Sequence, residues 1–292
     1  MRPARALWTL ALLQSAAVPR PEAPASAPAS RPTKSELDAH VVSLKKRVDS
    51  NAFTFVVEPP FVVIGDQAPE RVRQWAEGTV RWAATKLRAE YFDRDPEGIL
   101  DVWLFGGRES YEKNVERLFH ESPGTPFGWY SPEHRALIMN IATGGGTLVH
   151  EMVHPFMHAN FPECPAWLNE GLGSLYEQCE ERNGRIHGRT NWRLPVIQEA
   201  LREKRAPAFE SLLAATDFEF YGEDRGLNYA AARYLCYALQ EKGLLRRFYR
   251  EFRAAHPKDA SGLATLRSVL GADDLSGFRR EWETLVLGLR FP

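Results

Sequence analysis

The chain has 292 residues, 44% of them hydrophobic and 26% charged, and its 37 basic and 38 acidic side chains leave a formal net charge of -1. A chain this apolar and this evenly charged is not wholly disordered, and its length suits one large domain or two small ones. Because it lacks the positive surplus that binds phosphate backbones, we expect no nucleic-acid partner. No apolar run reaches the roughly 20 residues that cross a bilayer, so we also expect no integral membrane span.

The first 32 residues differ in composition from the rest of the chain. Arg2 and Arg5 precede a mostly apolar stretch that ends among small residues, an order typical of a secretory signal peptide. We therefore predict a signal peptide over residues 1–18 and an exported protein, periplasmic or extracellular. A disordered start rich in alanine and leucine is the alternative. Residues 19–32, rich in proline, alanine and serine, predict a disordered linker, so the folded part should begin at Thr33.

Up to residue 146 the sequence predicts alternating strands and helices. Stretches rich in β-branched and aromatic residues predict strands over residues 61–64, 100–105 and 136–141. Apolar residues at helical spacing predict helices over residues 70–91 and 108–119. We expect residues 128–134 to form a turn that leads into the third strand.

From residue 147 onward the predicted elements are helical. They cover residues 147–158, 165–178, 195–203, 228–241, 244–255 and 274–287. A mixed sheet and helix subdomain over residues 33–146, followed by a helical subdomain over residues 147–292, indicates an α+β fold. An active-site cleft is expected between the two parts.

Three cysteines are too few for a disulfide framework. Cys164 and Cys179 flank a predicted helix, and 15 residues of uninterrupted helix would separate them by about 22 Å. A disulfide needs Cα atoms within about 7 Å, so we expect buried free thiols.

Residues 150–154 read His-Glu-Met-Val-His, the HExxH pattern. On a helix, side chains four residues apart lie one turn apart on the same face, so His150 and His154 can reach one metal ion. Glu151 follows the first histidine, where its carboxylate can face a water bound to that metal. The pattern therefore predicts a zinc site with Glu151 as the general base.

A catalytic zinc ion needs a third protein ligand and an open position for water. Glu170 lies 16 residues after His154, which is enough chain to leave one helix, turn and enter another. Pro165 suits the first turn of that second helix. Glu170 is therefore the predicted third ligand, and a solvated helix glutamate is the alternative.

Other nearby side chains fit the third position less well. His158 lies eight residues after His150, about 12 Å along the helix axis, so those two cannot share one ion. Asn160 stands where the longer HExxHxxGxxH pattern would need histidine. Glu163 falls in the expected turn, and Cys164 offers a soft thiolate that suits a structural zinc better than a hydrolytic one.

The sequence HEMVH followed by PAWLNEGL resembles the gluzincin clan of zinc metallopeptidases. It is most similar to bacterial peptidase-MA-like domains that carry a W-L-x-E-G second motif. The specific match covers residues 150–176, less than a tenth of the chain. The resemblance implies a zincin-like fold, one catalytic zinc ion, Glu151 as general base and a peptide or protein substrate. The ligands that it implies are His150, His154 and Glu170.

The resemblance also suggests where the substrate binds. In such enzymes the substrate lies along an edge strand beside the active-site helix, and here we expect that strand over residues 137–141. Aminopeptidase N-like relatives stabilise the oxyanion with a tyrosine from a later helix, and the segment around Tyr229 is similar to the start of that helix. Tyr229 is therefore the predicted oxyanion donor, with Tyr130, Tyr221 and His187 as alternatives.

Two features depart from the family pattern. Aminopeptidase N-like enzymes carry a Gly-x-Met-x-Asn motif before the helix, and its absence from this chain means that exopeptidase activity is not implied. Thermolysin-like enzymes carry an aspartate four residues after the third ligand, bonded to a ligand histidine. Ser174 occupies that position here, so we expect the groups behind the ligands to be arranged differently.

These residues predict zinc-dependent hydrolysis of peptide bonds. Glu151 would take a proton from a water activated by zinc and pass it to the leaving nitrogen. One alternative is a zinc hydrolase of a non-peptide amide, which would use the same residues. Another is a non-catalytic binding protein with a zinc fold, against which the intact Glu151 argues. A purely structural zinc would need four protein ligands, and the spacing brings only three together.

Overall fold

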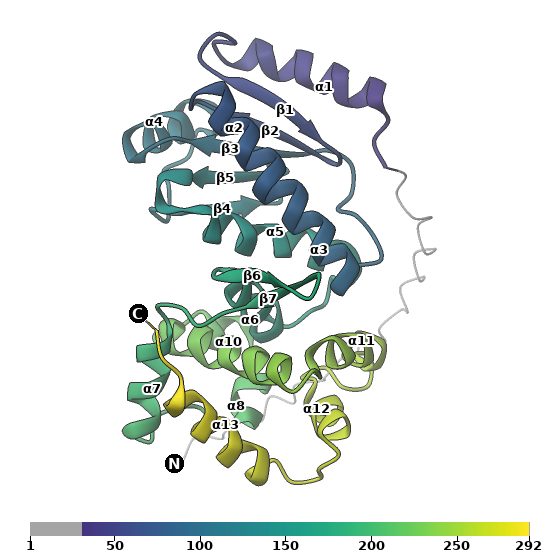
Figure 1. Ribbon diagram of the computed structural model, residues 1–292, viewed down its shortest axis with the longest axis vertical. Helices are drawn as coiled ribbons and strands as arrows, with labels where there is room; N and C mark the ends of the chain where they lie inside the picture. The colour runs from purple at the N-terminus through teal and green to yellow at the C-terminus, as the bar shows by residue number, and fades with distance from the viewer. Residues whose placement is uncertain (1–30, 292) are drawn as a thin grey trace, which may run out of the picture.

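The computed structural model describes residues 31–291 (Figure 1). These residues combine a five-stranded mixed sheet, helices on both of its faces and a largely helical second part, in agreement with the predicted mixture of strands and helices. The predicted signal peptide, and the linker up to residue 30, lie outside the described residues. Within residues 31–291, no helix has both the length and the apolar character needed to cross a membrane.

The central sheet has the strand order β1-β2-β3-β5-β4. Its strands are β1 (Thr54–Glu58), β2 (Phe61–Gly65), β3 (Leu100–Phe105), β4 (Gly128–Ser131) and β5 (Ala136–Asn140). Strands β2, β3 and β5 run parallel, whereas β1 and β4 are antiparallel to their neighbours at the two edges. The three predicted strands are confirmed as β2, β3 and β5.

The edge of the sheet beside the helix that carries the HExxH motif differs from the prediction. Residues 128–131, expected to be part of a turn, form the edge strand β4, in which Trp129 pairs with Ile138. Strand β5 is therefore flanked on both sides and is not an edge strand, so the expectation for residues 137–141 was wrong. The chain reverses after Ser131, where Arg135 adopts a positive φ of 50°, and this reversal places β4 outside β5.

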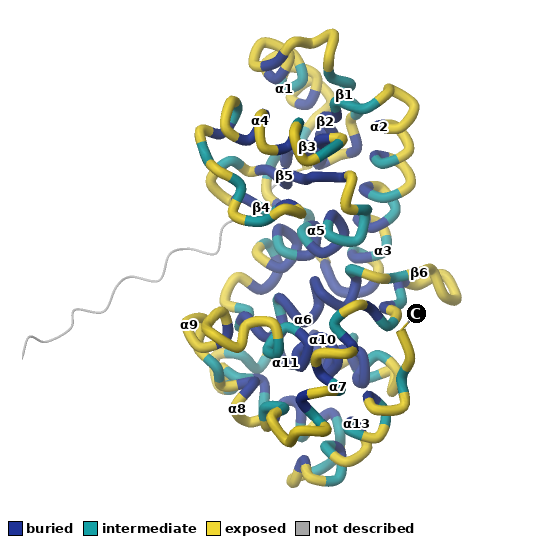
Figure 2. The backbone as a smooth tube through the Cα atoms, turned by 90° about the vertical axis from the view of Figure 1, so that its left-hand side faces the viewer, coloured by how far each residue is buried: buried dark blue, intermediate teal, exposed yellow. Residues whose placement is uncertain are grey.

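Helices cover both faces of the sheet, and this explains why β2, β3 and β5 are buried along their whole length (Figure 2). One face carries a continuous helical rod and the helix α5 (Gly145–Asn160). The rod comprises α2 (Pro69–Trp75), the π-helical segment η1 (Ala76–Arg81) and α3 (Trp82–Glu90), which together confirm the helix predicted over residues 70–91. The other face carries α1 (Lys34–Arg47) and α4 (Arg108–Phe119).

The second part of the chain packs around α10 (Arg225–Glu241), whose central residues are buried. The short helix η2 (Ile141–Thr143) leads into α5, and the remaining helices are α6 (Ala166–Tyr176), α7 (Leu194–Arg202), α8 (Phe209–Ala214), α9 (Asp217–Phe220), α11 (Leu245–Ala255), α12 (Leu263–Leu270) and α13 (Ser276–Gly288). This part also contains a hairpin, β6 (Cys179–Arg182) and β7 (Arg185–Gly188), which the helical prediction missed. One hydrophobic cluster runs from Phe61 in the sheet to Val286 in the last helix, so the two predicted subdomains share a core.

All three cysteines are free, as expected. Cys236 is buried, whereas Cys164 and Cys179 are only partly buried. Burial raises the pKa of the Cys236 thiol to about 12, which keeps it protonated and unreactive near neutral pH.

Helix α1 was not predicted, although its start carries a capping box. The Thr33 hydroxyl accepts a hydrogen bond from the Glu36 amide, and the Glu36 carboxylate accepts one from the Thr33 amide. Helix α1 packs Leu37 and Leu44 against the sheet. Its His40 imidazole lies 2.7 Å from the Asp101 carboxylate on β3, and this hydrogen bond raises the pKa of His40 above 6.5 despite partial burial.

The His40 contact predicts a pH-dependent contribution to stability. Because the folded-state pKa of His40 is raised, its contribution should be fully present below about pH 6.5 and should disappear as the pH rises through the folded-state value. The side chain is one-third exposed, so we expect at most about 1 kcal/mol. Urea unfolding of the wild type and of His40→Gln, from about pH 5.5 to about pH 8.5, measures this contribution as the difference between their free energies of unfolding. A difference that does not shrink with rising pH would contradict this assignment.

Candidate metal centre

Helix α5 presents both histidines of the HExxH motif on one face. His150 and His154 lie one turn apart, and their ring centroids are 4.9 Å apart. The other face of the helix is buried in the core through Leu148, Met152 and Phe156. This division follows from the sequence, because apolar residues fill the positions between the motif residues.

Helix α6 brings Glu170 to the two histidines. The helix begins after Pro165, and fully buried Trp167 and Leu168 fix it against the core. Oε2 of Glu170 lies 3.1 Å from Nε2 of His150 and 3.9 Å from Nε2 of His154. The three predicted ligands, which come from two helices, thus converge with little exposure to solvent.

This set of donors fits a zinc ion. One ligand atom from each of His150, His154 and Glu170 lies within 4.8 Å of the other two. Donors around one tetrahedral zinc are about 3.4 Å apart, so shifts on the order of 1 Å would suffice. Within residues 31–291, no second group of histidine, cysteine, aspartate or glutamate side chains meets the same criterion, and the rival ligands His158, Glu163 and Cys164 do not belong to this group.

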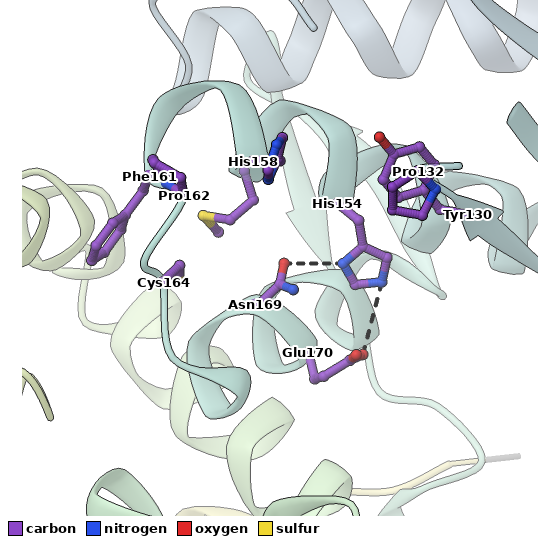
Figure 3. Close-up of a pocket in the computed structure, with 10 residues that line it drawn as sticks. Tyr130, Pro132, His154, His158, Phe161, Pro162, Cys164, Asn169 and Glu170 are labelled. Carbon is purple, nitrogen blue, oxygen red and sulfur yellow. Dashed lines mark hydrogen bonds and ion pairs between the residues drawn. The ribbon is translucent and has the colours of Figure 1, made fainter. Parts of the chain in front are cut away.

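A pocket of about 270 Å³ opens beside His154 and Glu170 (Figure 3). It extends from the end of β4 to the loop that follows α5, and thus lies where the sheet meets the helical part. Its remaining walls are formed by Tyr130, Pro132, Met157, His158, Phe161, Pro162, Cys164 and Asn169. The space leaves room for a water molecule or a larger group next to two of the candidate ligands, whereas a structural zinc site is closed by protein ligands.

Glu151 is held between α5 and the edge strand β4. Its Oε2 accepts a hydrogen bond from the backbone amide of Tyr130 at 2.9 Å and lies 3.8 Å from Nε2 of His154. Burial raises the pKa of Glu151, although the nearby imidazoles of His150 and His154 oppose that rise. The carboxylate is thus a stronger base than an exposed glutamate and lies beside the candidate metal position.

Glu170 and His150, two of the candidate ligands, shift each other's pKa in opposite directions. Burial alone would raise the pKa of Glu170, but attraction to His154 and the hydrogen bond with His150 outweigh it and hold the pKa at about 2. Burial alone would lower the pKa of His150, but the hydrogen bond with Glu170 and the close contact with the Glu177 carboxylate raise it well above 6.5. A metal ion bound here would displace a proton from the imidazole.

Two of the predicted tyrosines lie near Glu170. The Tyr221 hydroxyl, just after α9, donates to Oε1 of Glu170 at 2.9 Å and so leaves Oε2 facing the histidines. Tyr229, near the start of α10, packs its ring against Tyr221 with a centroid separation of 6.2 Å. Burial and the Glu170 charge raise the pKa of both phenols, so both remain protonated hydrogen-bond donors.

The other two candidates for the oxyanion donor differ in position. Tyr130 lines the pocket, with its amide bonded to Glu151. His187 lies on β7, where its Nε2 is 3.1 Å from the Glu241 carboxylate, and it does not line the pocket.

The sequence analysis missed the partners of the two histidines. Oδ1 of Asn169 lies 3.0 Å from Nδ1 of His154, and because an amide oxygen only accepts, Nδ1 carries the proton. Oε1 of Glu177 lies 3.2 Å from Nδ1 of His150, an ion-pair contact rather than a well-aligned hydrogen bond. Both contacts leave Nε2 available to a metal. Asn169 adjoins Glu170 in sequence and could have been suspected, whereas no short motif marks Glu177.

Comparisons of the sequence with models of protein families and with curated proteins found no match. The resemblance to gluzincins therefore rests on the motif residues, and the metal-site assignment rests on those residues and their geometry.

The geometry predicts one zinc ion per chain. It also predicts that two histidines of α5, His154 and His158, differ in their effect on zinc binding. His154→Ala removes a ligand and should abolish stoichiometric zinc binding, whereas His158→Ala, one turn further along the helix, should retain it. Elemental analysis after dialysis against trace zinc measures both. Equal zinc content in the two variants would contradict the proposed ligand set.

Proposed function

We propose that this protein is a zinc-dependent hydrolase of peptide bonds with a zincin-like fold. The single observation that carries this proposal is the convergence of His150, His154 and Glu170 beside the Glu151 carboxylate and an open pocket. When bound, a zinc ion supplies Lewis acidity that activates water and polarises a carbonyl oxygen. The remaining chemistry falls to side chains of the chain itself.

Glu151 is the proposed general base. The Tyr130 amide fixes Oε2 of its carboxylate, and the other oxygen is left to accept a proton from the attacking water. In the second half of the reaction the same oxygen would donate that proton to the leaving nitrogen.

Strand β4 is the proposed binding edge for the substrate backbone. One side of β4 pairs with β5, and its other side lies beside α5 at the pocket that Tyr130 and Pro132 line. An extended peptide can add to such an edge through backbone hydrogen bonds. This arrangement favours a peptide over a small non-peptide amide, and it replaces the strand over residues 137–141 as the expected location.

Tyr229 is the proposed oxyanion donor, with Tyr221 in a different role. Tyr221 already donates its hydroxyl to Glu170 and is therefore proposed to orient that ligand. Tyr229 offers a protonated phenol from α10, near the same carboxylate. A donor directed at the developing negative charge stabilises the transition state more than the ground state, and this lowers the barrier.

One further proposal depends on the sequence and not on the site. Export to the periplasm or outside the cell rests on residues 1–18 alone. A structural zinc role is the less favoured alternative, because the pocket lies directly at His154 and Glu170. Substrate profiling separates peptides from other amides.

Replacing the proposed base tests the function directly. Glu151→Gln keeps the shape of the side chain and every metal ligand, so zinc content should remain near one per chain. Turnover should fall by about 10²- to 10⁴-fold, because proton transfer is lost. Cleavage of a peptide library, with and without a chelator, measures the activity. Glu116→Gln, at an exposed position on α4, is the matched control.

The hydrolase proposal has clear contrary outcomes. Wild-type protein that carries zinc but cleaves no peptide in the library would contradict peptide hydrolysis. A Glu151→Gln variant with near-normal turnover would remove Glu151 from the mechanism.

The two tyrosines should respond differently to loss of the hydroxyl. Tyr229→Phe should lower kcat by about 10²- to 10³-fold and leave the zinc dissociation constant unchanged, because it removes a donor used only during reaction. Tyr221→Phe should instead weaken zinc binding, since Glu170 loses its hydrogen bond. Steady-state kinetics and zinc competition with a chromophoric chelator separate the two. Reversal of this pattern would exchange the assigned roles.

A further inference from the structure

A buried carboxylate, Glu177, lies behind the first candidate ligand. Its Oε1 is 3.2 Å from Nδ1 of His150, while Nε2 of the same imidazole faces Glu170. Both side chains are nearly inaccessible, with 6% of His150 and 12% of Glu177 exposed. Ser174, which occupies the position four residues after Glu170, has a buried hydroxyl without a hydrogen-bond partner and so does not fill this role.

The Glu177 carboxylate is fixed in place by two residues that precede or begin α7. Arg193 donates to both of its oxygens, from Nε at 3.0 Å and from Nη2 at 2.7 Å. Asn191, almost fully buried, donates from Nδ2 to Oε2 at 2.8 Å. A carboxylate that accepts three hydrogen bonds has little freedom to turn. The surrounding fold therefore sets its distance from the imidazole.

Two glycines allow α5 and α6 to approach closely enough for this contact. A Cβ atom on Gly146 would lie 2.1 Å from the backbone oxygen of Glu177, a distance that no side chain can occupy. A Cβ atom on Gly173 would lie 3.1 Å from Nε2 of His150, tighter than most real contacts. Because Gly146 lies one helical turn before His150 on α5, this close approach brings the end of α6 near His150.

A buried arginine fixes the end of α6, from which Glu177 projects. Arg233 of α10 is fully buried, and its Nε donates to the backbone oxygen of Ser174 at 3.0 Å. Its Nη2 reaches the backbone oxygen of Leu175 at 3.4 Å. These bonds satisfy carbonyls at the helix end and place a positive charge where the helix dipole is negative.

We propose that Glu177 is a positioning residue that sets the metal affinity of the site by holding the proton of His150 on Nδ1. This inference rests on the proposed zinc site. A carboxylate on the far nitrogen fixes the orientation of an imidazole and makes its other nitrogen a better ligand. His154 has only the neutral amide of Asn169 in the equivalent place, so Glu177 is the charged group of the pair. Arg193 and Gly146 contribute through their contacts with Glu177.

The decisive variant is Glu177→Gln, which removes the charge but preserves the size of the side chain. Zinc competition with a chromophoric chelator should show a dissociation constant raised by about 10- to 100-fold. The visible spectrum of the cobalt-substituted protein should change as well, because His150 is held less firmly. A purely structural role for Glu177 would lower the unfolding temperature without altering the cobalt spectrum of the folded protein.

Glu58→Gln is the matched control. Glu58 lies on β1 with its side chain 10% exposed and accepts bonds from Nε and Nη2 of Arg81 at 2.7 Å and 2.6 Å. It therefore reproduces the burial and the arginine pairing of Glu177 without a histidine partner. We expect it to lower stability to a similar degree while the zinc dissociation constant stays at the wild-type value.

The outcomes distinguish this inference from the proposed function. Wild-type protein that binds no zinc overturns both. Wild-type affinity in folded Glu177→Gln overturns only the role of Glu177. If Glu177→Gln does not fold, Glu177→Asp is the second variant, because it keeps the charge opposite Arg193 but moves it away from His150 by one methylene group. A wild-type zinc dissociation constant in Glu177→Asp would also overturn the inference.

Discussion

The contact between His150 and Glu170 is the interaction on which the rest of the site depends. It joins α5, which packs against the sheet, to α6, which packs against α10, so the two parts of the shared core meet at this point. A buried imidazole and a buried carboxylate lose hydration energy that their mutual attraction only partly restores. A bound divalent cation would restore more, so occupancy of the site and stability of the fold should be linked.

The groups that would act on a substrate come from different layers of the molecule. Strand β4 holds the proposed general base through its backbone, α5 and α6 supply the candidate ligands, and the residue after α9 and the start of α10 supply the phenols. Each group is attached to an element that is fixed by burial elsewhere. The candidate ligands therefore already lie close to a metal-binding arrangement, which would lower the ordering cost of binding an ion.

Sequence reasoning succeeded where the signal is local and failed where it depends on the folded chain. The four-residue spacing of His150 and His154 is a property of any helix, and the continuous apolar runs of β2, β3 and β5 reflect burial on both faces. Strand β4 has four residues, too few to show alternation, and pairs only because β5 is adjacent. Helix α1 was missed even though Thr33 and Glu36 form a recognisable cap. Glu177 could not be found, because its contact with His150 requires two helices, a glycine and an arginine from elsewhere in the chain.

The guanidinium of Arg193 contacts three neighbours at once. It holds Glu177 through paired hydrogen bonds, and it stacks 4.2 Å from the ring of Trp192 and 4.9 Å from the ring of Tyr229. The group behind the candidate ligand His150 and the group behind the proposed oxyanion donor Tyr229 therefore share one side chain. Changes at these positions should be energetically non-additive, since each alters the group on which the other relies. Neither the metal affinity of the proposed site nor the position of the Tyr229 phenol can then be adjusted in isolation, whether by natural variation or by engineering.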